Sequence, residues 1–221
     1  MVVVINGEKI SLDSSYLKNN KIGFGSEGVV YKFGDYALKL YYDNPRKNIL
    51  DTDTINYLST IETDRILLPI DGAFSEQGDL LGYLTKYHNT NKLKGIKNMD
   101  ISTFIDEVEK IENDAIYLEE SRVDIDDLHR ENIVFDGSIN LVDPGSYMIS
   151  DNFYINNSEK VEEFVLEEII YPIAISMFNS KKANNLLNDI SNNTNQSISQ
   201  FVKDTSSSFD TVKSYVKRMG K

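Results

Sequence analysis

The stretch Gly23-Phe-Gly25-Ser-Glu-Gly28-Val-Val30 constrains the fold most, because its spacing G-x-G-x-x-G-x-V can open either a helix or a strand. Glycine lets a backbone approach phosphate groups closely and donate N–H groups to them without steric hindrance. A dinucleotide-binding turn needs a helix straight after the third glycine. Residues 29–33, Val-Val-Tyr-Lys-Phe, are instead mostly β-branched or aromatic, which predicts a strand. The stretch therefore predicts a glycine-rich β-hairpin, with or without a phosphate ligand.

A lysine lies on the strand predicted to follow this hairpin. The segment Tyr36-Ala-Leu-Lys39 is part of a strand predicted over residues 36–42, across a Gly34-Asp35 turn. An ammonium group at this place can reach under the glycine hairpin and pair with phosphates. A strand lysine on its own usually faces solvent, but its coupling to the glycine hairpin favours a binding role for Lys39.

Two further motifs come later in the chain, Asp127-Leu-His-Arg-Glu-Asn132-Ile-Val134 and Leu141-Val-Asp143-Pro-Gly145. Phosphoryl transfer needs a carboxylate near the attacking hydroxyl and oxygen ligands for a metal that bridges the phosphates. Asp127 and Asn132 have the spacing D-x-x-x-x-N, and Asp143 follows the second strand of a short predicted hairpin. The side chains of Asn132 and Asp143 offer the hard oxygen ligands that Mg²⁺ prefers. Each motif alone also fits an ordinary polar loop or a D-P-G turn.

Together and in this order, the motifs resemble those of the protein-kinase-like superfamily from about Ile22 to Tyr147. The resemblance implies ATP and Mg²⁺ as cofactors and transfer of the γ-phosphoryl group to a hydroxyl. It implies that Asp127 is the catalytic base, that Lys39 and Asn132 act with it, and that Asn132 and Asp143 bind Mg²⁺. The nucleotide contacts that it implies are Gly23, Gly25, Gly28, Val30, Ala37, Lys39, Asp53 and the hinge residues Lys86, Tyr87 and His88.

The sequence departs from the pattern of protein kinases at several places. Ile125 and Asp126 replace the usual His-Arg before the catalytic aspartate, so control by activation-loop phosphorylation is not expected. Pro144 replaces the phenylalanine of D-F-G, and no A-P-E-like motif follows. His129 gives D-L-H-x-x-N, which is similar to aminoglycoside- and choline-kinase-like phosphotransferases; alternatively, His129 only forms a hydrogen bond within its loop.

The usual acidic partner of the strand lysine is also absent. A helix predicted over residues 47–61 contains no glutamate that could pair with Lys39. Asp53 is the first candidate for this pairing and Asp51 is the second. An aspartate is one methylene shorter than a glutamate, so the helix would have to lie closer to the sheet; the alternative for either residue is an ordinary solvated charge.

The apolar pattern predicts an α+β fold with strands first and helices later. The predicted strands are 2–5 and 8–10, paired across an Asn6-Gly7 type I′ turn, then 28–33, 36–42, 66–70, 80–87, 133–136 and 139–142. The predicted later helices are 101–118, 161–178 with a kink at Pro172, 183–190, and 209–219 capped by Gly220, with a Ser/Asn/Thr-rich loop before the last one. The resemblance implies a bilobal fold, with a β-rich N-lobe over 1–87 that holds a single helix and a reduced helical C-lobe over 88–221.

The composition limits the partners. The 221 residues carry a net charge of −12, which disfavours binding to nucleic acids or anionic lipids. No apolar run approaches the ~20 residues that span a bilayer, and the N-terminus lacks the features of a signal peptide. There is no cysteine, and two histidines, His88 and His129, are too few for a histidine metal site. We therefore expect a cytoplasmic protein with no nucleic-acid or membrane partner.

Several functions fit these features. An active ATP-dependent phosphotransferase is favoured, with a protein hydroxyl preferred to a small molecule as the phosphate acceptor. A second hypothesis is a pseudokinase that serves as a nucleotide-binding or interaction module. A third is a regulatory or toxin-like kinase that docks a protein partner through its C-terminal helix, although such an apolar stripe can also pack on its own domain. The stripe consists of Phe209, Val212, Tyr215, Val216 and Met219.

Overall fold

The computed structural model describes residues 1–45, 49–89, 95–151, 154–192, 197–206 and 209–219. The chain is of the α+β class and divides into two units. The sheet unit comprises Met1–Thr63, Leu67–His88 and Asp143–Ile149, and the helical unit comprises Asp64–Ile66, Asn89–Val142 and Ser150–Lys221. In the described residues, no helix is both long and apolar enough to cross a membrane.

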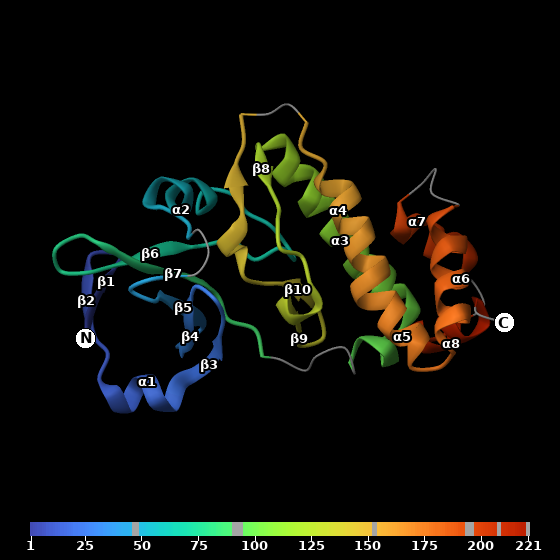
Figure 1. Ribbon diagram of the computed structural model, residues 1–221, viewed down its shortest axis with the longest axis horizontal. Coiled ribbons are helices and arrows are strands. Elements are labelled where there is room, and N and C mark those ends of the chain that lie inside the picture. The colour runs from blue at the N-terminus through green and yellow to red at the C-terminus, as the bar shows by residue number, and fades with distance from the viewer. Residues whose placement is uncertain (46–48, 90–94, 152–153, 193–196, 207–208, 220–221) are drawn as a thin grey trace. The chain divides into compact units, whose positions relative to one another are not determined.

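The sheet unit is built on a seven-stranded antiparallel sheet (Figure 1). Its strand order is β2-β1-β6-β7-β5-β4-β3. The strands are β1 (Val2–Ile5), β2 (Glu8–Ser11), β3 (Lys21–Phe24), β4 (Gly28–Phe33), β5 (Tyr36–Tyr41), β6 (Asp71–Phe74) and β7 (Leu80–Lys86). A 3₁₀ turn, Pro144–Ser146, and the short strand β11 (Met148–Ile149) complete this unit.

Two predicted hairpins are confirmed. Asn6 and Gly7 have φ angles of 51° and 77°, as a type I′ turn requires, and β1 pairs with β2 on either side of them. Strands β4 and β5 pair across the Gly34-Asp35 turn. The predicted strand 66–70 is wrong, because β6 begins only at Asp71. Residues 66–68 are apolar because they are buried, and Pro69, which has no N–H, separates them from β6.

The sheet unit contains two helices, so the prediction of a single helix is wrong. Helix α1 (Ser14–Asn20) begins after Asp13, whose carboxylate accepts a hydrogen bond of 2.6 Å from the N–H of Tyr16. Helix α2 (Thr52–Leu58) is shorter than the predicted 47–61, and residues 46–48 lie outside the described part. Its N-cap is Asp51, which accepts a hydrogen bond of 2.7 Å from the N–H of Thr54.

One face of the sheet forms the apolar core of this unit. Leu38 and Leu40 of β5 are buried there, and Tyr16 and Leu17 of α1 pack against the same cluster. The other buried members are Val3, Ile5, Leu12, Ala73 and Leu84. Each fully buried aliphatic side chain contributes about 1.5–3 kcal/mol. Because side chains alternate along a strand, Lys39 points to the opposite face of β5.

The helical unit is organised around α3 (Ile101–Glu120), whose predicted apolar stripe is buried. Helix α3 packs against α4 (Asn157–Phe164) and α7 (Ile198–Thr205). The other elements are a 3₁₀ turn (Ile96–Asn98), β8 (Val123–Asp124), a 3₁₀ turn (Arg130–Asn132), the hairpin β9 (Ile133–Phe135) and β10 (Ile139–Leu141), α5 (Tyr171–Ile175), α6 (Ser180–Ser191) and α8 (Val212–Met219).

The helix predicted over 161–178 changes its winding near Pro172. A π-helical segment, Val165–Ile170, separates α4 from α5, and Pro172 lies in the first turn of α5. Proline has no N–H for the regular α-helical hydrogen bond, which accounts for the irregular winding beside it.

The end of the chain differs from the prediction at one element. Helix α7 was not expected, because it lies beside a Ser/Asn/Thr-rich stretch that predicts a loop; its N-cap is Ser197. Helix α8 packs against α5 and α3, and Val212, Tyr215 and Val216 are buried there. The predicted cap at Gly220 lies outside the described residues.

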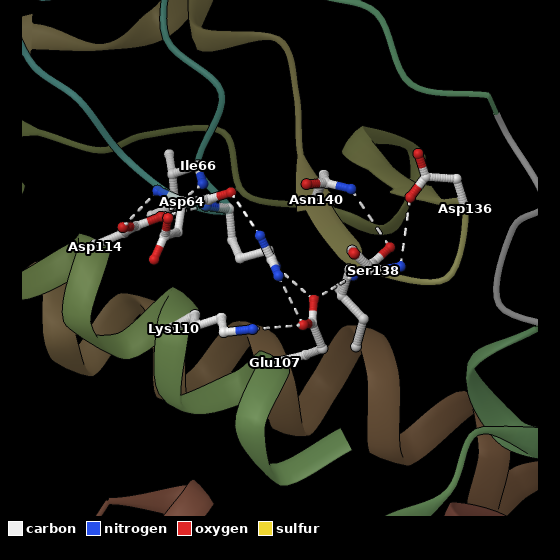
Figure 2. Close-up of polar contacts among 10 residues, drawn as sticks. Asp64, Ile66, Glu107, Lys110, Asp114, Asp136, Ser138 and Asn140 are labelled. Carbon is white, nitrogen blue, oxygen red and sulfur yellow. Dashed lines mark hydrogen bonds and ion pairs between the residues drawn. The ribbon is translucent and has the colours of Figure 1, made fainter. Parts of the chain in front are cut away.

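Two buried carboxylates of α3 organise the polar contacts of the helical unit (Figure 2). Glu107 accepts hydrogen bonds from the guanidinium of Arg65 at 2.5 and 2.8 Å, from Lys110 at 3.1 Å and from the N–H of Ile139 at 3.0 Å. Burial raises the pKa of Glu107, but these hydrogen bonds outweigh burial and hold it below its ordinary value. The ionised carboxylate thus links α3 to strand β10 and to the segment around Arg65.

Asp114 lies further along α3 and binds three consecutive N–H groups (Figure 2). Its carboxylate accepts hydrogen bonds from the backbone of Asp64, Arg65 and Ile66 at 2.9, 2.6 and 2.9 Å. These bonds satisfy three N–H groups of a segment that lies outside the named helices and strands and forms a β-bridge between Ile66 and Leu141.

Candidate functional site

Lys39 lies on the face of the sheet opposite the apolar cluster that contains Leu38 and Leu40. It is directly opposite Val30 of β4 and Tyr83 of β7 in the strand register. Directly paired residues point to the same face of a sheet, and Ala37 shares that face because it is two residues from Lys39. The structure therefore brings together three of the predicted nucleotide contacts, Val30, Ala37 and Lys39.

The ammonium group of Lys39 is held between two carboxylates. Its Nζ lies 2.6 Å from Oε2 of Glu27 and also forms an ion pair with Oδ1 of Asp143. Lys39 and Glu27 are 4% and 5% exposed, whereas the side chain of Asp143 is 38% exposed. Tyr83 donates a hydrogen bond of 3.1 Å to the same oxygen of Asp143. We call these four residues the Lys39 cluster.

Tyr83 serves the cluster as a permanent hydrogen-bond donor. Complete burial, followed by the negative charge of Asp143, raises the pKa of its phenol well above the ordinary value. The phenol therefore keeps its proton at neutral pH and can donate it in a hydrogen bond to Asp143. With one lysine and two carboxylates, the cluster has a formal charge of −1, and removing one partner of such a buried ion pair costs about 3–5 kcal/mol.

The backbone at both predicted catalytic carboxylates has an unusual conformation. In the part of the chain that the structure describes, four non-glycine residues have positive φ: Asn6, Arg122, Asp127 and Asp143. Asn6 belongs to a type I′ turn, which requires this conformation. Asp127 (φ 59°) and Asp143 (φ 68°) are the predicted catalytic base and metal ligand. A positive φ costs a non-glycine residue about 1–3 kcal/mol, and such residues cluster at functional sites.

The glycines of the hairpin formed by β3 and β4, here called the glycine hairpin, have different roles. A Cβ at Gly28 would overlap the carbonyl of Leu40 on β5, so the close approach of two strands requires this glycine. A Cβ at Gly25 would meet nothing within 4 Å, and one at Gly23 would make only an ordinary contact with Val30. Packing within the protein therefore requires glycine at position 28. It does not require glycine at positions 23 and 25, where the absence of a side chain can instead allow close approach to a ligand.

Asp127 and Asn132 lie together in the helical unit. The side-chain amide of Asn132 donates a hydrogen bond of 3.1 Å to the backbone carbonyl of Asp127. Nε2 of His129 lies 3.8 Å from Oδ1 of Asp127, whose side chain is 35% exposed. His129 is thus close to the predicted catalytic base and within the same loop.

A cavity of about 230 Å³ adjoins Asp127 within the helical unit. Its charged lining consists of Lys160 and five carboxylates, those of Asp126, Asp127, Glu163, Glu167 and Glu168. Lys160 is already bound to Asp124 at 2.5 Å and to the carbonyl of Ile125 at 2.7 Å. The wall around Asp127 therefore favours cations over anions.

The prediction that Lys39 pairs with Asp53 or Asp51, at helix α2, is wrong. Asp53 is exposed in the first turn of α2, and Asp51 caps that helix. Among the described residues, the ion-pair partners of Lys39 are instead Glu27 and Asp143. Glu27 was not predicted as a site residue; the signal for it is an acidic residue between the glycines of an otherwise small and apolar loop.

The predicted hinge lies at the end of β7. Lys86 is exposed, and the ring of Tyr87 lies 4.7 Å from the ammonium of Lys32. The N–H of Tyr87 donates a hydrogen bond of 2.9 Å to the carbonyl of Asp35. That N–H is therefore engaged and does not serve as an adenine donor in this conformation; His88 is half-buried beside it.

Asp143 is accessible as a ligand for Mg²⁺, whereas Lys39 is not accessible to a polyphosphate in this conformation. The described residues contain no group of three His, Cys, Asp or Glu side chains placed to hold a metal. Mg²⁺ needs only one or two protein carboxylates when phosphates and waters complete its shell, and the exposed part of Asp143 could supply one. The ammonium of Lys39 could bind a phosphate, but Glu27 now covers it.

Comparison of the chain with models of protein families and with curated protein sequences gives no match.

Proposed function

We propose that the chain is an ATP- and Mg²⁺-dependent phosphotransferase with a bilobal protein-kinase-like fold, which transfers the γ-phosphoryl group to a hydroxyl. The contact between Lys39 and Asp143 carries this proposal. These residues are 104 positions apart, and the sequence pattern alone predicts phosphate binding for one and metal binding for the other. A glycine hairpin, a strand lysine and a D-P-G aspartate on one face of one sheet unit fit few other activities.

The two units supply different groups in this proposal. In the sheet unit, Lys39 binds the phosphates and Asp143 holds Mg²⁺, which, when bound, neutralises charge that develops on the phosphates. In the helical unit, Asp127 would accept the proton of the acceptor hydroxyl, and Asn132 fixes the loop that carries Asp127 by its hydrogen bond to the Asp127 carbonyl. Catalysis of this kind depends almost entirely on placement and electrostatics.

We propose a protein hydroxyl as the phosphate acceptor and a small-molecule hydroxyl as the alternative. The glycine hairpin and the A-L-K strand support the first, since they resemble those of protein kinases most closely. The position of His129 beside Asp127 supports the second, since D-L-H-x-x-N is similar to the loop of small-molecule phosphotransferases. A screen of basic proteins and amino-sugar acceptors with the same labelled nucleotide separates the two.

The test is transfer from γ-labelled ATP with Mg²⁺ by the purified chain, by Asp143→Ala, and by Glu76→Ala as a matched control. Glu76 also forms an ion pair in the sheet unit, with Lys9 at 2.8 Å, but on the exposed surface. Label on protein or released phosphate should appear with the parent and the control and disappear with Asp143→Ala. Equal transfer by all three proteins, or by none, would refute the proposed activity.

A pseudokinase is the second candidate, because two carboxylates already occupy the ammonium of Lys39. This candidate predicts that MgATP raises the melting temperature while no label is transferred to any acceptor, since a ligand stabilises by RT ln(1 + [L]/Kd). An active enzyme shows both the shift and the transfer.

A further inference from the structure

We propose that Glu27 is an internal competitor of the anionic ligand: its carboxylate holds the glycine hairpin closed on Lys39 and must leave before a polyphosphate can bind. This inference rests on the proposed function, because it concerns the same lysine. It adds a residue outside the expected catalytic set that determines the affinity of the site.

The burial of the pair shows that the two groups exclude other partners. Glu27 and Lys39 are 5% and 4% exposed, and Glu27 Oε2 lies 2.6 Å from the ammonium nitrogen. Lysine has three donor hydrogens, and Glu27 and Asp143 engage two of them. The third is not accessible from solvent either, because the side chain of Lys39 is only 6% exposed, so an anion can reach the ammonium only if one carboxylate moves. Asp143 is also held by the hydrogen bond from Tyr83, whereas Glu27 lies in the three-residue tip between β3 and β4, so we expect Glu27 to be the carboxylate that moves.

The carboxylate of Glu27 also fills the space beside the D-P-G segment, residues 143–145. A Cβ at Gly145 would overlap Oε2 of Glu27, so the carboxylate lies directly against the backbone of Gly145. Glu27 thus joins the glycine hairpin to Lys39 on one side and to the D-P-G segment on the other. Both of these contacts lie within the sheet unit.

The rest of the hairpin tip is weakly held. Only residues 25–27 connect β3 to β4, and the N–H of Gly25 bonds to the carbonyl of Gly28 within the hairpin itself. The ring of Phe24 is 75% exposed, so it does not anchor the tip by burial. The N–H of Tyr42 bonds to the carbonyl of Glu27, next to the pair with Lys39. The Glu27–Lys39 ion pair is therefore the main side-chain contact that holds the tip down.

Removing the charge of Glu27 while keeping its shape should favour the ligand. Glu27→Gln replaces a charge-assisted hydrogen bond with a neutral one, which weakens the internal competitor by enough to tighten polyphosphate binding about tenfold. A residue that only positioned Lys39 for the ligand would give the opposite result, because its loss would weaken binding.

The first measurement needs no ligand. Amide hydrogen exchange of residues 23–28 is compared in the parent, in Glu27→Gln and in the Glu76→Gln control. Exchange should be faster in Glu27→Gln alone, while the core strands β5 and β7 keep their protection. Unchanged exchange in the hairpin overturns the inference, whether or not ATP binds. If Glu27→Gln does not fold, Glu27→Asp serves instead, because its shorter side chain should also release the tip.

The second measurement is calorimetric titration of the same proteins with MgATP and with inorganic tripolyphosphate. Tighter binding by Glu27→Gln than by the parent and the control supports the inference, and weaker or equal binding overturns it. Faster hairpin exchange with no binding by any variant upholds closure by Glu27 and refutes the phosphotransferase proposal instead. Binding by the parent with unchanged hairpin exchange overturns closure by Glu27 and leaves intact the nucleotide binding that the proposed function requires, so the two failures are distinguishable.

Discussion

Replacing Glu107 by glutamine should destabilise the helical unit strongly and change its response to acid. The side chain of Glu107 is 6% exposed and accepts hydrogen bonds from Arg65, Lys110 and Ile139. Its loss leaves the guanidinium of Arg65, only 17% exposed, without its carboxylate. Breaking one partner of a buried pair costs about 3–5 kcal/mol; the remaining carbonyl oxygen of glutamine and the partial exposure of Arg65 place the expected loss near the lower value.

The pH dependence follows from the lowered pKa of Glu107. A carboxyl whose pKa is lower in the folded chain than the ordinary 4.5 binds protons more readily in the unfolded chain. Its stabilisation is therefore complete above about pH 4.5 and is lost as the pH falls through the folded-state pKa. Consequently, the difference in stability between parent and Glu107→Gln should shrink in acid.

Urea unfolding at several pH values, followed by circular dichroism, measures this difference. Glu109→Gln is the matched control, because Glu109 is exposed on the same helix. We expect a loss of about 3 kcal/mol for Glu107→Gln at pH 7 and less than about 0.5 kcal/mol for the control. A loss for Glu107→Gln no greater than that of the control, or a difference that grows in acid, would refute the assignment of an ionised Glu107 bound to Arg65.

Three other predictions concern the sheet unit. Gly28→Ala should lower the unfolding free energy by about 2 kcal/mol, because its Cβ overlaps the Leu40 carbonyl. Gly25→Ala should leave the unfolding free energy within about 0.5 kcal/mol of the parent and weaken MgATP binding. Similar melting curves for the two variants would contradict these roles. Asp13→Ala should cost about 1 kcal/mol by removing the cap of α1, and urea titration would show no change if the cap were unimportant. Tyr83→Phe should cost about 1 kcal/mol and weaken Mg²⁺-dependent nucleotide binding, since Asp143 loses its neutral donor; unaltered calorimetric titrations would argue against that role.

Elements with a local signal could be predicted from the sequence. The Asn6-Gly7 and Gly34-Asp35 turns fix two hairpins because glycine and asparagine tolerate positive φ. The apolar stripe of α3 repeats over twenty residues, enough to identify a helix without tertiary information. Helix α1 has only seven residues and no fully buried side chain, so its one signal is the Asp13 cap. The apolar run 66–68 resembles a strand because burial alone gives the same apolar pattern as a buried strand; these residues are buried but form no named strand, and Ile66 makes a single β-bridge to Leu141.

The candidate site could be predicted only where motif residues have fixed spacing. Lys39 and Asp143 were identified as candidates by their motifs, and the structure places them in contact. The pairing of Lys39 with Glu27 depends on how the hairpin tip lies on the sheet, which no local pattern of residues 21–33 specifies. The expectation of a partner in α2 failed because Asp51 is used as a helix cap and Asp53 faces solvent.

Phosphoryl transfer by this chain can be measured as single-turnover transfer from γ-labelled MgATP, with Asp127→Asn beside the parent. Asparagine tolerates the positive φ of this position, so the variant should stay folded and bind MgATP as the parent does. We expect transfer by Asp127→Asn to fall by about 10²–10⁴-fold while the MgATP thermal shift stays unchanged. Undiminished transfer by Asp127→Asn, or no transfer by the parent, would contradict this expectation.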